Sequence, residues 1–122
     1  MSITLHHTIV PARESVASAR YFADLFGLTY EGPIGQFAAV RINETLTFDF
    51  DDRPPGFEMH HYAFLMNDEE FDSILGRVKK AGIPYGSSPG SLDDMKVGEW
   101  SGKRGVYFRD LAGHLLEIRT LA

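Results

Sequence analysis

Apolar residues recur every three or four positions in two stretches of the chain, which is the spacing of one face of an amphipathic helix. In the first stretch, residues 15–26, they are Val16, Ala19, Phe22, Ala23 and Phe26. In the second stretch, residues 69–81, they are Phe71, Ile74, Leu75, Val78 and Ala81. The pattern therefore predicts one helix in each half of the chain.

Residues at the ends of both stretches fit helix boundaries. Ser15 is a candidate N-cap, and Gly27 suits a C-cap in the left-handed conformation. Asn67, followed three residues later by Glu70, has the pattern of a capping box.

Short apolar or alternating runs around these helices predict β-strands. In the first half the runs cover residues 3–10, 37–42 and 46–50, with a short further strand at 28–31. In the second half they cover residues 60–66, 105–109 and 114–120. Residues 86–104 are polar and rich in glycine and serine, which predicts a long loop that acts as a mobile lid.

The two halves also repeat one another. His6-His7 opens the first half and His60-His61 opens the second. A repeat of this length indicates two copies of one supersecondary unit. The paired histidines thereby become candidates for a symmetric site between the copies.

The repeat predicts an α+β fold organised as one domain over residues 1–122. Module one covers residues 1–52 and module two covers residues 58–122. Residues 53–57, with two prolines and a glycine, are expected to be a linker because they cannot continue a central strand.

Composition narrows the class of protein. With 43% hydrophobic and 24% charged residues, the chain has the composition of a folded globular protein. The net charge of −5, without any stripe of Lys and Arg, argues against a nucleic-acid partner. No apolar stretch approaches the roughly 18 residues of a membrane span, so no membrane partner is expected. The absence of cysteine and of a secretory signal pattern favours a cytoplasmic protein.

A carboxylate stands between large apolar residues in the last predicted strand of each half. Phe48-Asp49-Phe50 aligns with Leu116-Glu117-Ile118, and in the preceding strands Val40-Arg41-Ile42 aligns with Val106-Tyr107-Phe108. A carboxylate in a hydrophobic strand is costly unless it faces water or binds a cation. Each half therefore offers a histidine pair on its first strand and a carboxylate on its last.

These residue types suit a metal site. Neutral imidazole and carboxylate are ligands for iron, zinc, manganese and nickel. Neighbouring side chains on a strand point to opposite faces, so only one histidine of each pair can face a shared site. Two histidines and one carboxylate suit Fe(II) oxygen chemistry, whereas a fourth ligand would suit a metal acting as a Lewis acid.

A plain structural interpretation stands beside the metal site. The histidines can be ordinary strand residues, and Glu117 can be an edge-strand charge paired with Arg119 or Arg109. Asp49 can belong to a solvated acidic run with Asp51 and Asp52.

Three segments carry a resemblance to a known family: residues 5–10 (LHHTIV), 61–64 (HYAF) and 106–117 (VYFRDLAGHLLE). They resemble the vicinal-oxygen-chelate superfamily, the glyoxalase/bleomycin-resistance/extradiol-dioxygenase fold, and the similarity extends over residues 3–120. The last segment is similar to the family's Tyr-Phe-x-Asp-Pro-Asp-Gly-x-x-Leu-Glu pattern, with Leu111-Ala112 in place of the usual Pro-Asp. The resemblance implies paired βαβββ modules whose mixed sheets form a cup around a metal or ligand site.

The resemblance also implies a ligand set. The metal ligands that it implies are His7, His61 and Glu117, holding a divalent ion such as Fe, Zn, Mn or Ni. His6 and His60 would face away from the site. Asp49 falls where glyoxalase I has a further glutamate ligand, which makes it a candidate fourth ligand. In the resembled family two chains commonly complete the cup, so a homodimer is expected.

For function, the resemblance implies a metal-dependent enzyme that chelates vicinal oxygens of a small metabolite, as a lyase, an isomerase or a dioxygenase. It identifies no catalytic residue beyond the metal ligands. Ile9 stands where fosfomycin-resistance transferases need a threonine, and Phe50-Asp51-Asp52 lacks the asparagine of glyoxalase I, so both activities are disfavoured. Two alternatives stay open: a non-catalytic drug- or metabolite-binding protein of the bleomycin-resistance type, and a structural protein with a relic site.

Three further residues are substrate-binding candidates: Tyr107, Arg119 and Trp100. Arg119 lies two residues after Glu117 on a strand and so shares its face, where it would bind an anionic group or pair with a carboxylate. Tyr107 would donate a hydrogen bond to substrate or serve as a core tyrosine. Trp100 would stack on a planar ligand or anchor the long loop.

Overall fold

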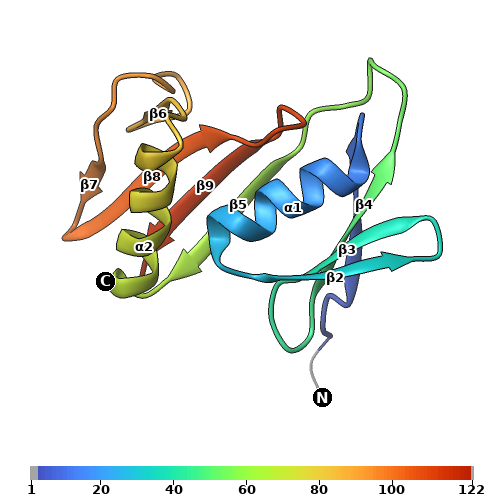
Figure 1. Ribbon diagram of the computed structural model, residues 1–122. Helices are drawn as coiled ribbons and strands as arrows, with labels where there is room; N and C mark the ends of the chain where they lie inside the picture. The colour runs from blue at the N-terminus through green and yellow to red at the C-terminus, as the bar shows by residue number, and fades with distance from the viewer. Residues whose placement is uncertain (1–2, 122) are drawn as a thin grey trace. The chain divides into compact units, whose positions relative to one another are not determined.

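Each half of the chain folds into a β-sheet with one helix packed on it (Figure 1). The computed structural model describes residues 3–121, which fall into two units divided between Glu58 and Met59. The predicted α+β fold of two βαβββ units is confirmed.

The first unit is a four-stranded mixed sheet. Its elements are β1 (His7–Ala12), α1 (Ser15–Phe26), β2 (Thr29–Ile34), β3 (Phe37–Arg41) and β4 (Thr47–Asp52). The strand order is β1-β4-β3-β2, with β1 parallel to β4 and the other pairs antiparallel. The strand predicted at residues 3–10 is observed as β1, which begins and ends later than predicted. Its ladder with β4 runs from the pair His7 and Thr47 to the pair Ala12 and Asp52.

The second unit repeats this plan with one addition. Its elements are β5 (His61–Met66), α2 (Asp68–Lys80), β6 (Tyr85–Gly86), β7 (Gly98–Trp100), β8 (Lys103–Arg109) and β9 (Leu115–Thr120). The strand order is β5-β9-β8-β6, with β5 parallel to β9, and β7 pairs with β8. The expectation of an unbroken loop over residues 86–104 is wrong, since β7 lies within it.

Aromatic side chains fill the core between α1 and its sheet. Phe22 is fully buried, and its ring centroid lies 4.3 Å from that of Phe26 and 5.5 Å from that of Phe48. Phe50 lies 6.0 Å from Phe22 by the same measure. In the second unit, Phe71 and the other apolar residues predicted on the second helix, except Ala81, are buried. In α1 the prediction is wrong for Val16, which is 45% exposed, and right for Ala19, Phe22, Ala23 and Phe26. The helical spacing thus identifies most of the residues on the faces that pack.

The two helices begin in different ways. In α1 the N-cap is Glu14, whose side chain makes no capping hydrogen bond, so the prediction of Ser15 as cap is wrong. Instead the Ser15 N–H donates to Oδ1 of Asp52 at 2.7 Å. Hydrogen bonds from the backbone and from the side chain of Ser15 hold the pKa of Asp52 below its ordinary value. The predicted C-cap is confirmed, with Gly27 at φ 66° and ψ 32°.

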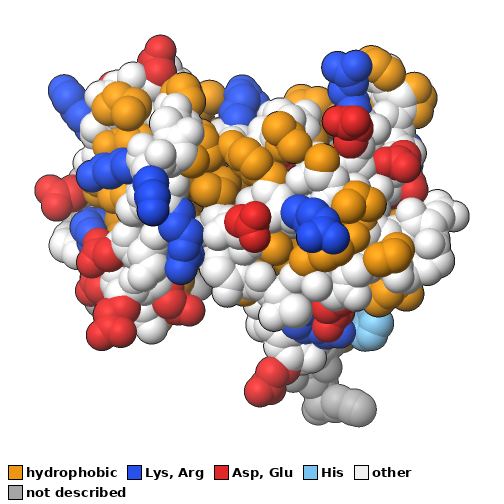
Figure 2. Space-filling view, viewed as in Figure 1, with side chains coloured by type: hydrophobic (Ala, Val, Ile, Leu, Met, Phe, Trp, Pro, Cys, Tyr) orange, Lys and Arg blue, Asp and Glu red, His pale blue; other side chains and the backbone are white. Residues whose placement is uncertain are grey.

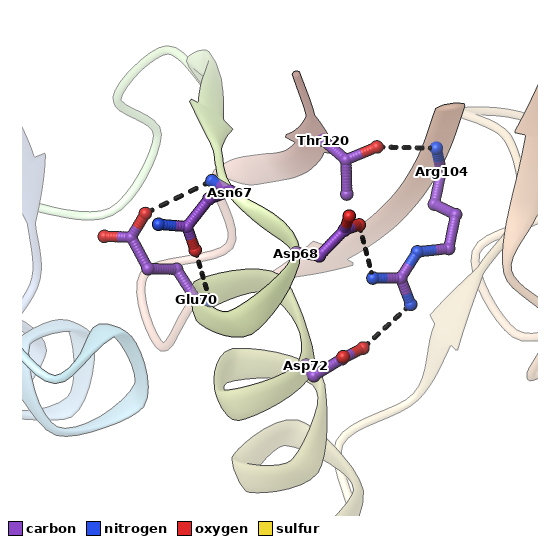
Figure 3. Close-up of polar contacts among 6 residues, drawn as sticks. All are labelled: Asn67, Asp68, Glu70, Asp72, Arg104 and Thr120. Atoms are coloured by element: carbon purple, nitrogen blue, oxygen red, sulfur yellow. Dashed lines mark hydrogen bonds and ion pairs between the residues drawn. The ribbon is translucent and has the colours of Figure 1, made fainter. Parts of the chain in front are cut away.

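The capping box predicted for α2 is confirmed (Figure 3). The Glu70 N–H donates to Oδ1 of Asn67 at 2.8 Å, and the Asn67 N–H donates to Oε1 of Glu70 at 3.2 Å. In Figure 2 acidic side chains gather over the first turn of α2 and basic ones over its later turns. Both distributions oppose the helix dipole and stabilise the helix.

Removing this cap gives a first testable change. Asn67→Ala leaves the Glu70 N–H without its acceptor, and we expect a loss of about 1 kcal/mol in the free energy of unfolding. Urea denaturation measures it. Ser73→Ala, at an exposed position within the same helix, is the control and should change stability by less than about 0.5 kcal/mol. Equal effects of the two substitutions would contradict the capping role.

Neither α1 nor α2, the helices within residues 3–121, has the length and apolar character that a membrane crossing requires.

Candidate metal centre

The register of β5 and β9 places a histidine and a carboxylate on one face of the second sheet. His61 is the Cα partner of Leu115, and Ala63 is the partner of Glu117. Because paired residues share a face and alternate residues along a strand return to it, His61 and Glu117 point the same way. His61 Nε2 lies 3.0 Å from Glu117 Oε1. The side chain of Glu117 is 8% exposed and that of His61 is 48% exposed, so a buried carboxylate meets an accessible imidazole.

Two more side chains surround the Glu117 carboxylate. Tyr107 on β8 is its direct cross-strand partner and is hydrogen-bonded to it. Burial, together with the charge of Glu117, raises the pKa of Tyr107 above its ordinary value. Arg119 Nε lies 3.5 Å from Glu117 Oε2. The face shared by Arg119 and Glu117, expected from alternation, is therefore observed.

Trp100 joins this group through Arg119. The Arg119 guanidinium carbon lies 4.6 Å from the centroid of the Trp100 ring, a cation–π contact. All three predicted substrate-binding side chains thus lie on the Glu117 side of the second sheet, and Arg119 contacts both a carboxylate and an aromatic ring. Their role in substrate binding stays a prediction.

The residue before the candidate ligand has different surroundings. His60 Nδ1 lies 2.5 Å from the Tyr62 hydroxyl oxygen, and the His60 N–H donates to Nδ1 of His114 at 2.8 Å. His114 is fully buried, and its backbone N–H donates to Oδ1 of Asp110 at 2.8 Å. His60, directly before β5, and His61, its first residue, therefore belong to separate clusters, as strand alternation predicts.

The sequence analysis missed His114 as a member of the second cluster. It lies inside the segment that carries the family resemblance, directly after Gly113, but it was predicted only as the first residue of the strand at 114–120. Its position before the parallel strand β9 brings its ring beside the start of β5. The available signal was a histidine between two apolar runs, a type of residue that is buried only when its ring nitrogens are satisfied.

Tyr62 in this cluster gives a prediction about pH. Burial, and then the negative charge of Asp110, raise the pKa of Tyr62 to about 12. The folded state therefore keeps a proton that the unfolded state releases near pH 10, so folding stability should fall as pH rises from about 10 to 12. The slope of unfolding free energy against pH in this window should be shallower in Tyr62→Phe. An unchanged slope would show that Tyr62 ionises as freely in the folded protein as in the unfolded one.

The first unit carries the corresponding pair on β1 and β4. His7 pairs with Thr47 and Ile9 pairs with Asp49, so His7 and Asp49 share a face in the same arrangement as His61 and Glu117. The His7 side chain is exposed, with its Nδ1 2.8 Å from Nδ1 of His6. Asp49 is half-buried.

The predicted alignment of the preceding strands is wrong by two residues. Asp49 is paired with Ala39, whereas Glu117 is paired with Tyr107. Tyr107 therefore corresponds to Ala39 and not to Arg41, so only the second unit places a hydroxyl beside its carboxylate. The true counterpart of Arg41 is Arg109, which occupies the equivalent register position.

The donor set in the second unit fits a divalent ion. Two atoms that each lie about 2.1 Å from one ion are about 3 Å apart when they subtend a right angle at it. The 3.0 Å between His61 Nε2 and Glu117 Oε1 has this magnitude. Within residues 3–121 no group of three or more such side chains is assembled, so His61 and Glu117 form a two-residue part of the predicted set. The inclusion of His7 stays a prediction.

Comparison with known proteins gives the family. Neither a protein-family model nor a curated protein matches the sequence. Among solved structures, the chain is similar to "Oxidase ChaP-H2", with 38% identity and a TM-score of 0.94 over 100% of this chain and 96% of that one. It is similar to "Oxidase ChaP-H1", with 39% identity and a TM-score of 0.92 over 99% of this chain and 98% of that one.

A more distant structure shares the fold. The lactoylglutathione lyase from Agrobacterium tumefaciens is 19% identical, with a TM-score of 0.72 over 97% of this chain and 93% of that one. With the two oxidases similar over nearly the whole sequence, and with the two βαβββ units in place, the chain belongs to the vicinal-oxygen-chelate superfamily.

Proposed function

We propose that this protein is a metal-dependent oxidase of a small molecule that carries two adjacent oxygen atoms. The observation that carries the proposal is the His61–Glu117 pair, at 3.0 Å on one face of the second sheet. The identity of 38% and 39% to two proteins named as oxidases favours oxygen-dependent chemistry over lyase or isomerase chemistry.

The proposed ligands are His7, His61 and Glu117, around a divalent ion of the Fe, Mn, Ni or Zn type. Such an ion, when bound, supplies Lewis-acid stabilisation of negative charge on substrate oxygens and, if it is iron, access to oxygen chemistry. Asp49 is the candidate fourth ligand, since it shares a face with His7 on the first sheet. Its side chain is one methylene shorter than that of Glu117.

The surrounding side chains have proposed roles in substrate binding. Tyr107 is protonated at neutral pH, and it can donate its hydroxyl proton to a substrate oxygen in place of Glu117. Arg119 supplies a positive charge for an anionic group, and Trp100 supplies an aromatic surface. Because Tyr107 and Arg119 flank the same carboxylate, a substrate there would meet a hydrogen-bond donor and a cation together.

Oxygen uptake by the metal-loaded protein tests this function. Fe(II)-loaded protein is mixed with catechols, α-hydroxyketones and other compounds bearing adjacent oxygens, and an oxygen electrode records consumption. We expect uptake with at least one class and none with His61→Ala. Substrate conversion without oxygen uptake would assign a lyase or isomerase. Saturable binding without conversion would assign the non-catalytic alternative.

We also propose a cytoplasmic homodimer. β1 and β5 are edge strands of their sheets and expose apolar side chains, with Ile9 39% and Leu65 65% exposed. Exposed edges with apolar residues favour association with another chain. Sedimentation at micromolar concentration should give twice the 13.7 kDa of one chain. Leu65→Glu, which places a charge on this edge, should shift the protein toward monomer, and a wild-type monomer would contradict the proposal.

A further inference from the structure

The side chain of Arg119 is held between an aromatic ring and a carboxylate. Its guanidinium carbon lies 4.6 Å from the Trp100 centroid, and its Nε lies 3.5 Å from Glu117 Oε2. Among the described residues, this Nε is buried and makes no hydrogen bond, and its ion-pair partner is Glu117. The Arg119 side chain is 39% exposed overall, so only the Nε edge of its guanidinium is buried, beside the carboxylate of Glu117.

A glycine makes room for the aromatic ring. Gly105 on β8 is the cross-strand partner of Arg119, and a Cβ added at Gly105 would lie 2.4 Å from Cη2 of Trp100. The Trp100 ring therefore occupies the space that any other residue at position 105 would need. A two-residue turn, Ser101 at φ 51° and Gly102 at φ 77°, returns the chain from β7 to β8 and brings Trp100 back over the sheet.

The two oxygens of Glu117 consequently meet different partners. Oε1 faces Nε2 of His61 at 3.0 Å, and Oε2 faces Nε of Arg119 at 3.5 Å. The ion pair at Oε2, together with the contact from Tyr107, favours the rotation of the carboxylate in which Oε1 faces the histidine.

We propose that Trp100 and Arg119 are positioning residues that act together to orient Glu117 so that a single oxygen, Oε1, faces the metal position. Trp100 holds the guanidinium in place by stacking, and the guanidinium holds Oε2. The part of this inference that concerns a metal rests on the proposed function, whereas the orientation of Glu117 does not. Trp100 therefore helps to orient a metal ligand, in addition to its proposed contact with substrate.

The second unit contains a matched control for this arrangement. Arg104 also stacks on an aromatic ring, 4.4 Å from the Phe71 centroid, and pairs with Asp68 at 2.9 Å and Asp72 at 2.8 Å (Figure 3). It joins β8 to α2 and contacts neither His61 nor Glu117 in the described hydrogen bonds and ion pairs. Arg104→Met therefore removes a similar stacked ion pair that serves packing alone.

Titration with Co(II) of purified full-length protein is the first arm of the test. Groups that orient a metal ligand typically change metal affinity by about 10- to 100-fold when removed. We expect about 10-fold weaker Co(II) binding in Arg119→Met, in Trp100→Leu and in Gly105→Ala, which displaces the ring without deleting it. The Arg119→Met/Trp100→Leu double variant should lose no more than the worse single variant, because the two residues act as one unit. Arg104→Met should bind Co(II) as the wild type does.

The second arm uses metal-free protein and keeps the inference separate from the metal proposal. The ¹⁵N resonance of His61 Nε2 reports its contact with Glu117, and it should move in the three variants and stay in place in Arg104→Met. A wild-type protein that binds no Co(II), with the His61 resonance behaving as expected, would reject the metal site and retain the orienting role. Wild-type Co(II) affinity and an unmoved His61 resonance in Arg119→Met and Gly105→Ala would overturn the inference.

Discussion

Replacing Glu117 by glutamine should lower the affinity for a divalent metal by at least about 100-fold, more than the loss of a supporting residue does. The substitution keeps the shape of the side chain but removes its charge. In the structure this charge faces His61 Nε2 at 3.0 Å and Arg119 Nε at 3.5 Å, in a side chain that is 8% exposed. An amide there is a poor ligand, and it leaves the buried Nε of Arg119 without its ion-pair partner.

Isothermal titration with Co(II) or Mn(II) measures this effect, and Asp49→Asn is the matched comparison in the first unit. If His7, His61 and Glu117 are the whole ligand set, Asp49→Asn should bind metal nearly as the wild type does. An equal loss in both variants would mean four protein ligands, and lyase or isomerase chemistry would then be favoured over oxygen chemistry. Wild-type affinity in Glu117→Gln would remove Glu117 from the site.

The largest effect on stability should come from Phe22→Ala, at about 3–5 kcal/mol of unfolding free energy. Phe22 is fully buried and packs against Phe26, Phe48 and Phe50, so its loss opens a cavity among three rings. Stability is measured by urea denaturation. Phe37→Ala, at a half-buried position on β3 in the same unit, should cost clearly less. Equal losses in the two variants would show that the aromatic cluster does not dominate the core of this unit.

The helices and the separation of His60 from His61 follow from local patterns, and so they could be predicted from the sequence. Period-3.6 spacing identifies Phe22 and Phe71 as core residues, and period-2 alternation separates His60 from His61. The capping box of α2 is equally local, since Asn67 and Glu70 lie three residues apart. Each of these features depends only on residues close together in the chain. The shared face of His61 and Glu117 depends on the register of β5 with β9, and only the family resemblance implied it.

Features that depend on distant residues were missed. Asp52 takes the role expected of Ser15 because a strand end 37 residues away lies beside the start of α1. The hairpin of β7 and β8 was not predicted because β7 has only three residues. Ser101-Gly102, between Trp100 and Lys103, is nevertheless the sequence signal of a two-residue turn. Strand register decides which residue stands opposite a carboxylate. Aligning the strands by residue type alone therefore placed Tyr107 against Arg41 instead of Ala39.

The most direct test of a metal site built from His7, His61 and Glu117 compares the two members of each histidine pair. Co(II) stoichiometry and affinity are measured for His7→Ala, His61→Ala, His6→Ala and His60→Ala. The proposed site predicts that one ion binds per chain in the wild type, in His6→Ala and in His60→Ala, and that His7→Ala and His61→Ala lose it. Loss of the metal in the His6 and His60 variants with retention in the His7 and His61 variants would contradict it.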